Sequence, residues 1–156
     1  MTCSYWAWAS SHGAGDLVRI NRRLNAVGYV HILDTILLPS ILERYPNYNP
    51  VYVIEDNSAV HRAGIVNDWY AQHPQLVRMN HPAKSPDLNW MENLWSVMVR
   101  EWTPQQMANN ANALNDKVVQ SWNSLMQRHN IFERLSDSTP TRLQKVIEFE
   151  GTHITY

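Results

Sequence analysis

The run Val51–Ile54 most constrains the fold of this chain, because it is continuous, apolar and rich in β-branched side chains. Such a run is typical of a strand that is buried on both faces of a parallel sheet. A turn cluster, residues 46–50, precedes it, and Glu55-Asp56-Asn57 follows it. We therefore expect a parallel strand that delivers polar side chains at its carboxyl end, where ligands gather in open α/β sheets.

Strand and helix patterns alternate around this run, which favours an α/β fold. The other expected elements, in chain order, are a strand at Tyr5–Ala9, a glycine-containing turn at 10–15, a strand at Leu17–Ile20, a helix at 27–45, a helix at 59–72 and a strand at Leu76–Met79. Pro39 is expected to end or kink the first helix near its last turns, because proline cannot donate a backbone hydrogen bond.

From Asn89 onward the pattern is helical. Thr103-Pro104 and Thr139-Pro140 each look like an N-cap followed by proline at the first helical position, and Gly151 is expected to close the last helix. The apolar positions of the expected core face are Met91, Leu94, Trp95, Met98, Trp102, Met107, Ala111, Leu114, Val118, Trp122 and Leu125. No repeat or linker interrupts the 156 residues, so we expect one domain over residues 1–156.

Charge and cysteine content limit the function classes. With 13 Lys and Arg against 14 Asp and Glu, the chain has no overall basic field that attracts nucleic acid. DNA contacts would have to come from local clusters, namely Arg19/Arg22/Arg23 or Arg78/His81/Lys84. The single Cys3 excludes an internal disulfide framework, and the seven histidines show no zinc-site spacing. No run of about 18 apolar residues predicts a membrane helix, so no membrane partner is expected.

Two carboxylates are the candidate metal ligands. Asp56 follows the buried strand and Glu92 lies in the first turn of a helix, with residues 57–91 between them. Carboxylate oxygens are the ligands that hard divalent cations prefer, and a metal pair drives in-line attack on phosphodiesters. From position alone, Asp56 could equally cap a turn. Glu92 could simply be a first-turn glutamate that interacts favourably with the helix dipole. His61 could point back to Asp56 or be structural.

Taken in order, the motifs resemble a known family. They are Trp8-Ala9-Ser10 with residues 13–18, residues 29–33 with Leu38-Pro39-Ser40, Glu55-Asp56-Asn57 with His61, residues 81–89 with Glu92-Asn93-Leu94-Trp95, and residues 141–147 with 151–156. Together they resemble the catalytic region of the Tc/mariner superfamily of transposases, within the DDE group of ribonuclease H-like proteins. The pair SPDLN and ENLW is the most specific part of this resemblance.

The resemblance implies an α/β, ribonuclease H-like mixed sheet flanked by helices, with a helical C-terminal part. It implies that Asp56 and Glu92 are catalytic ligands of Mg²⁺ or Mn²⁺, and that Asn57, His61 and Asn93 support the site. The implied partners are transposon ends and target DNA in the nucleus, reached through DNA-binding residues that the sequence does not identify. A homo-oligomer is left open.

The chain departs from the family in one important respect. The family's first catalytic Asp lies on a strand upstream of the segment at Tyr5–Ser10; Asp16 falls at the expected hairpin turn and Asp34 in a helix, so neither matches it. The N-terminal helix-turn-helix region is also lacking. We therefore expect a partial catalytic domain without its first, central strand, inactive as a chain alone, from a fragment or a degenerate copy. The alternative is an inactive transposase-derived module that binds nucleic acid or protein.

Overall fold

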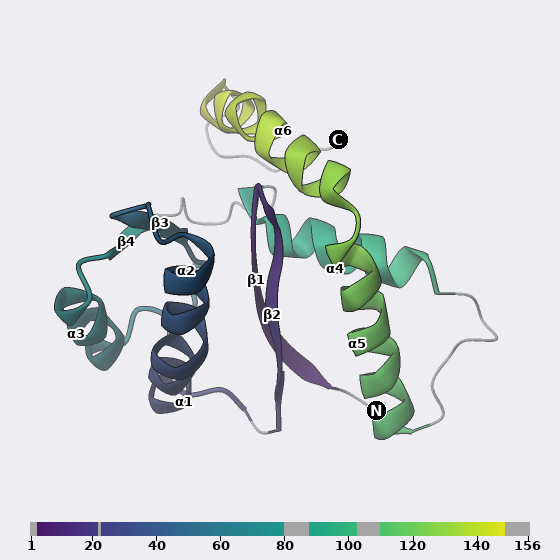
Figure 1. Ribbon diagram of the computed structural model, residues 1–156, viewed down its shortest axis with the longest axis horizontal. Coiled ribbons are helices and arrows are strands. Elements are labelled where there is room, and N and C mark those ends of the chain that lie inside the picture. Colours follow the sequence, from purple (N-terminus) through teal and green to yellow (C-terminus); the bar gives the residue numbers. More distant parts are fainter. Residues whose placement is uncertain (1–2, 22, 80–87, 103–109, 149–156) are drawn as a thin grey trace. The chain divides into compact units, whose positions relative to one another are not determined.

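A computed structural model of the protein describes residues 3–21, 23–79, 88–102 and 110–148 (Figure 1). The chain forms two compact units: unit 1 consists of residues 1–22 and 85–156, and unit 2 of residues 23–84. The expectation of one domain over residues 1–156 stays a prediction.

Unit 1 begins with an antiparallel hairpin of β1 (Ser4–Ser10) and β2 (Gly13–Ile20). Ser10 pairs with Gly13, so the turn is closed by two residues. Gly13 has a φ of 132°, a conformation that favours glycine. The expected turn over residues 10–15 was too long, and Asp16 lies within β2 rather than at the turn.

A tryptophan and a glycine fix the packing of the hairpin. The indole of Trp8 lies against Gly15, and its Nε1 donates to Asp16 Oδ2 at 3.0 Å. Trp122 Nε1 donates to the carbonyl of Gly15 at 3.0 Å, which ties the hairpin to a helix. Glycine at position 15 therefore allows an indole to contact the backbone directly.

Three helices complete unit 1: α4 (Trp90–Arg100), α5 (Ala111–Met126) and α6 (His129–Glu148). The buried residues of its core are Ala14, Leu94, Met98, Val118, Trp122, Leu125, Phe132 and Leu135. The helical stripes predicted through Leu94 and Met98 and through Val118, Trp122 and Leu125 are thus confirmed.

The predicted start of the last helix at Thr139-Pro140 is wrong, because both residues lie inside α6. The hydroxyls of Ser138 and Thr139 donate to the carbonyl of Leu135, so the turn before the proline keeps hydrogen bonds to the helix backbone. The apolar face of α6 is anchored upstream by buried residues, which favours a helix that continues through the proline. The expected caps at Thr103-Pro104 and Gly151 lie outside the described residues.

Unit 2 opens with a continuous helical stretch of α1 (Ala26–Ile32), a π-helical segment η1 (Leu33–Leu37) and α2 (Leu38–Arg44). Of the two outcomes expected at Pro39, an end or a kink of the helix, the end is wrong, because the helix continues through this residue. The distortion precedes it instead, and Leu38 N–H bonds to the carbonyl of Leu33, five residues earlier. A π-bulge is one way for a helix to absorb a local mismatch.

The stretch Ala26–Arg44 has the length and the mean hydropathy, 1.3, of a membrane-crossing helix, a test that core helices also meet. Its buried side chains are Tyr29, Ile32, Leu33, Leu37 and Ile41. They recur at helical spacing, and α1 packs against α3 (Gly64–Gln72). This pattern is that of an amphipathic helix with one face packed in unit 2 and the other exposed.

The two strands of unit 2, β3 (Val51–Ile54) and β4 (Leu76–Met79), pair in parallel and flank α3 in the sequence. The predicted strands and their parallel direction are confirmed. Burial on both faces is not, because Tyr52 and Ile54 are 63% and 59% exposed. Side chains therefore alternate along β3, with Val51 and Val53 directed inward and Tyr52 and Ile54 directed outward.

Candidate functional site

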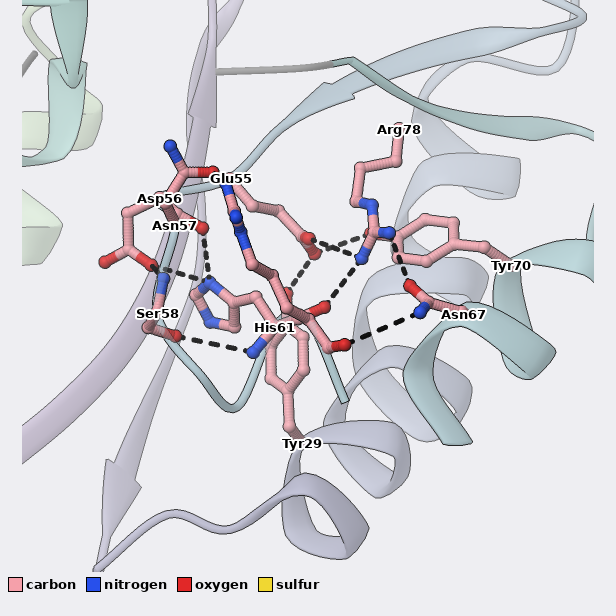
Figure 2. A network of polar contacts seen from close by, with 10 residues as sticks. Tyr29, Glu55, Asp56, Asn57, Ser58, His61, Asn67, Tyr70 and Arg78 are labelled. Carbon is pink, nitrogen blue, oxygen red and sulfur yellow. Dashed lines mark hydrogen bonds and ion pairs between the residues drawn. The ribbon is translucent and has the colours of Figure 1, made fainter. Parts of the chain in front are cut away.

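Asp56 lies just after β3, with its side chain 53% exposed. Its Oδ1 accepts a hydrogen bond from Ser58 N–H at 3.0 Å, and His61 Nδ1 lies 2.7 Å from the same oxygen (Figure 2). His61 Nδ1 is also 3.2 Å from the Asp56 carbonyl. Because both neighbours of Nδ1 are acceptors, this nitrogen carries the proton. The imidazole therefore points back to Asp56 and orients its carboxylate.

The turn after Asp56 is not helical, in contrast to the expected helix over residues 59–72. The helix α3 begins only at Gly64, so His61 precedes it. Asp56 bonds the backbone of Ser58, and Ser58 Oγ accepts from His61 N–H at 3.4 Å. Such short polar side chains offer the backbone an alternative to helical hydrogen bonds.

Three contacts hold His61 in place. The imidazole lies 4.4 Å from the ring of Tyr29, between centroids. Arg78 Nη1 donates to the His61 carbonyl at 2.6 Å, while the backbone N–H bonds Ser58. The position of the imidazole is thus determined from α1, from β4 and from its own turn.

A buried carboxylate, Glu55, anchors these contacts. Its side chain is 6% exposed, and its Oε1 accepts hydrogen bonds from the phenols of Tyr29 and Tyr70, the latter at 2.6 Å. Arg78 Nη1 lies 3.8 Å from Oε2. Burial, reinforced by the adjacent Glu55 carboxylate, raises the pKa of the Tyr70 phenol above its ordinary value. A buried charge needs such partners, because it has lost its hydration.

Arg78 is the cation that joins this network. Its guanidinium also donates to Asn67 Oδ1 and lies over the ring of Tyr70, 5.3 Å from the centroid. The arginine of the expected DNA-contacting cluster of Arg78, His81 and Lys84 is therefore engaged in contacts within unit 2; the other two members lie outside the described residues. Arg78 contributes to the site by supporting the turn that carries His61.

Sequence reasoning missed the roles of Tyr29, Glu55, Tyr70 and Arg78. One signal could have found Glu55: alternation along β3 assigns it to the same side as Val51 and Val53, away from Asp56. An inward glutamate requires polar partners, but the sequence does not say which tyrosines or which arginine supply them.

Glu55 and Arg78, together with Asp56 and His61, border an open cavity of about 270 Å³. Its lining consists of Glu55, Asp56, Asn57, His61, Arg62, Asn67, Arg78 and Met79. Asn57 accepts a hydrogen bond from the Arg62 guanidinium. The structure thus brings three of the predicted site residues, Asp56, Asn57 and His61, together in one polar cavity.

Glu92 and Asn93 belong to unit 1, in the first turn of α4. Asn89 caps this helix, since its Oδ1 accepts from Met91 N–H at 3.0 Å. Glu92 is exposed. Asn93 is engaged within unit 1, because its Nδ2 donates to the Asn89 carbonyl at 3.2 Å and its Oδ1 accepts from Arg142 at 3.4 Å.

The predicted ligands therefore lie in different units, Asp56 in unit 2 and Glu92 in unit 1. Within the described ranges, no group of three His, Cys, Asp or Glu side chains could hold a metal ion. The pairing of Asp56 with Glu92 around one site stays a prediction.

Curated relatives of this chain are transposases. It is 29% identical over 152 residues to the transposable element Tc1 transposase of Caenorhabditis elegans. The aligned region covers 97% of this chain and 53% of that protein. It is 25% identical to the Tc3 transposase of the same organism, over 99% of this chain and 46% of that protein. The chain thus spans about half the length of the curated relatives it matches.

Solved structures of Mos1 transposase share the fold. The Mos1 catalytic domain with raltegravir and Mg has a TM-score of 0.81 at 18% identity, over 98% of this chain and 77% of that one. The Mos1 mariner paired end complex with Mn has a TM-score of 0.82 at 20% identity, and the match covers 96% of this chain and 44% of that one. The predicted α/β, ribonuclease H-like fold class is therefore confirmed.

One family model spans most of the sequence, namely the DDE superfamily endonuclease, which matches residues 9–115. This range includes both acidic motifs, around Asp56 and around Glu92. The chain therefore belongs to the DDE superfamily of endonucleases, as its motifs predicted.

Proposed function

We propose that this chain is part of a DDE transposase catalytic domain, which cleaves DNA at transposon ends and joins the freed end to target DNA. One observation carries the proposal: Asp56 lies at the carboxyl end of a parallel strand, in a polar cavity, with its carboxylate oriented by His61 and Ser58. An oriented carboxylate at this edge of an α/β sheet is suited to hold a cation that acts on a bound ligand.

The two carboxylates fit a Mg²⁺ or Mn²⁺ ion chemically. Within the described part of the chain, Asp56 Oδ2 and the Glu92 carboxylate make no hydrogen bond or ion pair, so their oxygens are available. Mg²⁺ binds through one or two carboxylates and completes its shell with water and phosphate. When bound, divalent cations would activate the attacking oxygen and stabilise the leaving one.

The residues around the ligands have their own tasks. His61 and Ser58 hold one oxygen of Asp56, which leaves the other directed away from the turn. Asn89 starts the helix that carries Glu92. A two-metal site requires at least one further carboxylate, which we propose comes from a segment of a longer protein that precedes this one.

The solved relatives include a Mos1 pre-cleavage transpososome and a Mos1 strand transfer complex. These complexes support transposon ends and target DNA as partners of the longer protein, and we further propose that it forms a homo-oligomer. We further propose that it acts in the nucleus, where its DNA substrate would lie.

Cleavage of a Tc1-type transposon-end duplex by the purified chain, with Mg²⁺ or Mn²⁺, tests the function. In whichever preparation cleaves, the chain alone or the chain fused to an upstream aspartate-bearing strand, we expect Asp56→Asn and Glu92→Gln each to reduce cleavage to background, because each removes a charged ligand. Asp68→Asn is the matched control, since Asp68 is an exposed carboxylate on α3 outside the cavity; it should cleave like the wild type.

A second preparation carries an upstream strand with an aspartate, taken from the Tc1 relative and fused to the chain. Should both folded preparations fail to cleave, the proposal is contradicted and the alternative, an inactive module that binds nucleic acid or protein, is favoured. Cleavage by the fusion alone would place the missing ligand in that strand.

A further inference from the structure

We propose that Arg62 binds a phosphodiester of the DNA backbone in the cavity beside Asp56. This inference deepens the proposed function and rests on it. Arg62 lines the same cavity as Asp56 and is an exposed residue, so its guanidinium is accessible from solvent.

The two arginines of the cavity differ in how their charges are compensated. Arg78 lies 3.8 Å from the buried carboxylate of Glu55 and donates to the His61 carbonyl and to Asn67. Arg62 donates to Asn57 Oδ1, a neutral amide oxygen, and no carboxylate in the described ranges pairs with it. Arg62 is therefore the cavity arginine whose charge is available to an incoming anion.

The backbone around Arg62 is fixed, which makes it a prepared donor rather than a freely moving surface arginine. Its N–H bonds the Ser58 carbonyl at 3.2 Å, and its carbonyl accepts from Asn67 Nδ2 at 3.5 Å. One guanidinium nitrogen is docked on Asn57, and the other N–H groups can face a ligand. A preorganised guanidinium fork matches the geometry of a phosphate.

Charge in the cavity also selects an anion once the proposed cation is bound. Arg78 lies 3.8 Å from the carboxylate of Glu55, and Arg62 and Asp56 both line the cavity of about 270 Å³. A divalent cation on Asp56 would give this cavity a net positive charge. A phosphodiester then gains from the ion and from Arg62 together, whereas the chain as a whole, with a formal charge of −1, has no overall basic field to attract DNA.

The salt dependence of DNA binding tests this contact. The 156-residue chain is titrated with a fluorescent 20-base-pair duplex in Mg²⁺ at several salt concentrations. Arg62→Gln should weaken binding and reduce the slope of log affinity against log salt by about 0.9, the value for one phosphate contact. Arg62→Lys keeps the charge and should keep the slope. Arg128→Gln is the matched control, because Arg128 pairs with Glu101 outside the cavity.

An unchanged slope in Arg62→Gln, or a wild-type chain that binds no duplex at the lowest salt, overturns the phosphate contact. Inorganic phosphate forms a second arm: if it displaces the duplex at equal phosphate concentration, the site binds free phosphate and not the DNA backbone. Cleavage by the wild type and by Asp56→Asn is measured separately. Failure of the Arg62 contact with intact, Asp56-dependent cleavage would leave the proposed function standing.

Discussion

Trp8 leaves no room for a side chain on Gly15, since an added Cβ would lie 2.0 Å from Trp8 Cε2. We expect Gly15→Ala to lower the free energy of unfolding by about 1–3 kcal/mol, because the indole must move from its packed position. Chemical denaturation measures the change. Gly64→Ala is the control, because a Cβ there meets nothing within 4 Å; equal losses in both variants would contradict the steric explanation.

Tyr70 makes the stability of unit 2 sensitive to alkaline pH. Its phenol donates to Glu55, and burial raises its pKa above the value of about 10 for an unfolded chain. Above pH 10 the unfolded chain loses this proton while the folded chain keeps it, so the free energy of unfolding falls as pH rises.

Between pH 10 and 11 we expect this fall to be smaller by about 1 kcal/mol in Tyr70→Phe than in the wild type. Denaturation at the two pH values measures the difference. Tyr48→Phe serves as the control, because Tyr48 is 58% exposed. The same pH dependence in Tyr70→Phe and in the wild type would show that another group is responsible.

At the scale of single elements, the strands and the apolar faces of α4 and α5 could be predicted because patterning alone determines them. The start of α3 could not, since Asp56 and Ser58 bond the turn that a helical pattern would otherwise continue. The predicted helix start at Thr139-Pro140 was wrong because packing extends the helix where the local sequence predicts a boundary. Packing keeps α6 continuous through Pro140, although proline after threonine is typical of a helix start.

In the site, too, contacts within one turn could be predicted from the sequence and contacts between distant elements could not. The nearness of His61 to Asp56 could be anticipated, because only residues 57–60 of one turn separate them. The contacts of Glu55 with Tyr29, Tyr70 and Arg78 could not, because they join α1, α3 and β4, and only the fold brings these elements together. Long-range polar networks depend on three-dimensional packing that a one-dimensional pattern does not contain.

For the molecule as a whole, the small sheets have consequences for association. In the described residues each sheet has two strands, β1–β2 and β3–β4, so every strand is an edge strand. Two-stranded sheets are marginally stable by themselves, and unpaired edges favour pairing with another chain. The exposed face of the β3–β4 sheet carries Tyr52, Ile54, Val77 and Met79, an apolar surface beside those edges.

We therefore predict that the 156-residue chain is marginally stable or associates with itself. Sedimentation velocity between about 5 and 100 µM should show a weight-average coefficient that rises with concentration. Ile54→Lys should reduce this rise, because a charge on an edge strand opposes strand pairing. Ile147→Lys, on α6 and 71% exposed, is the control and should not. A wild-type chain that stays monomeric over this range and melts in one cooperative transition contradicts the prediction.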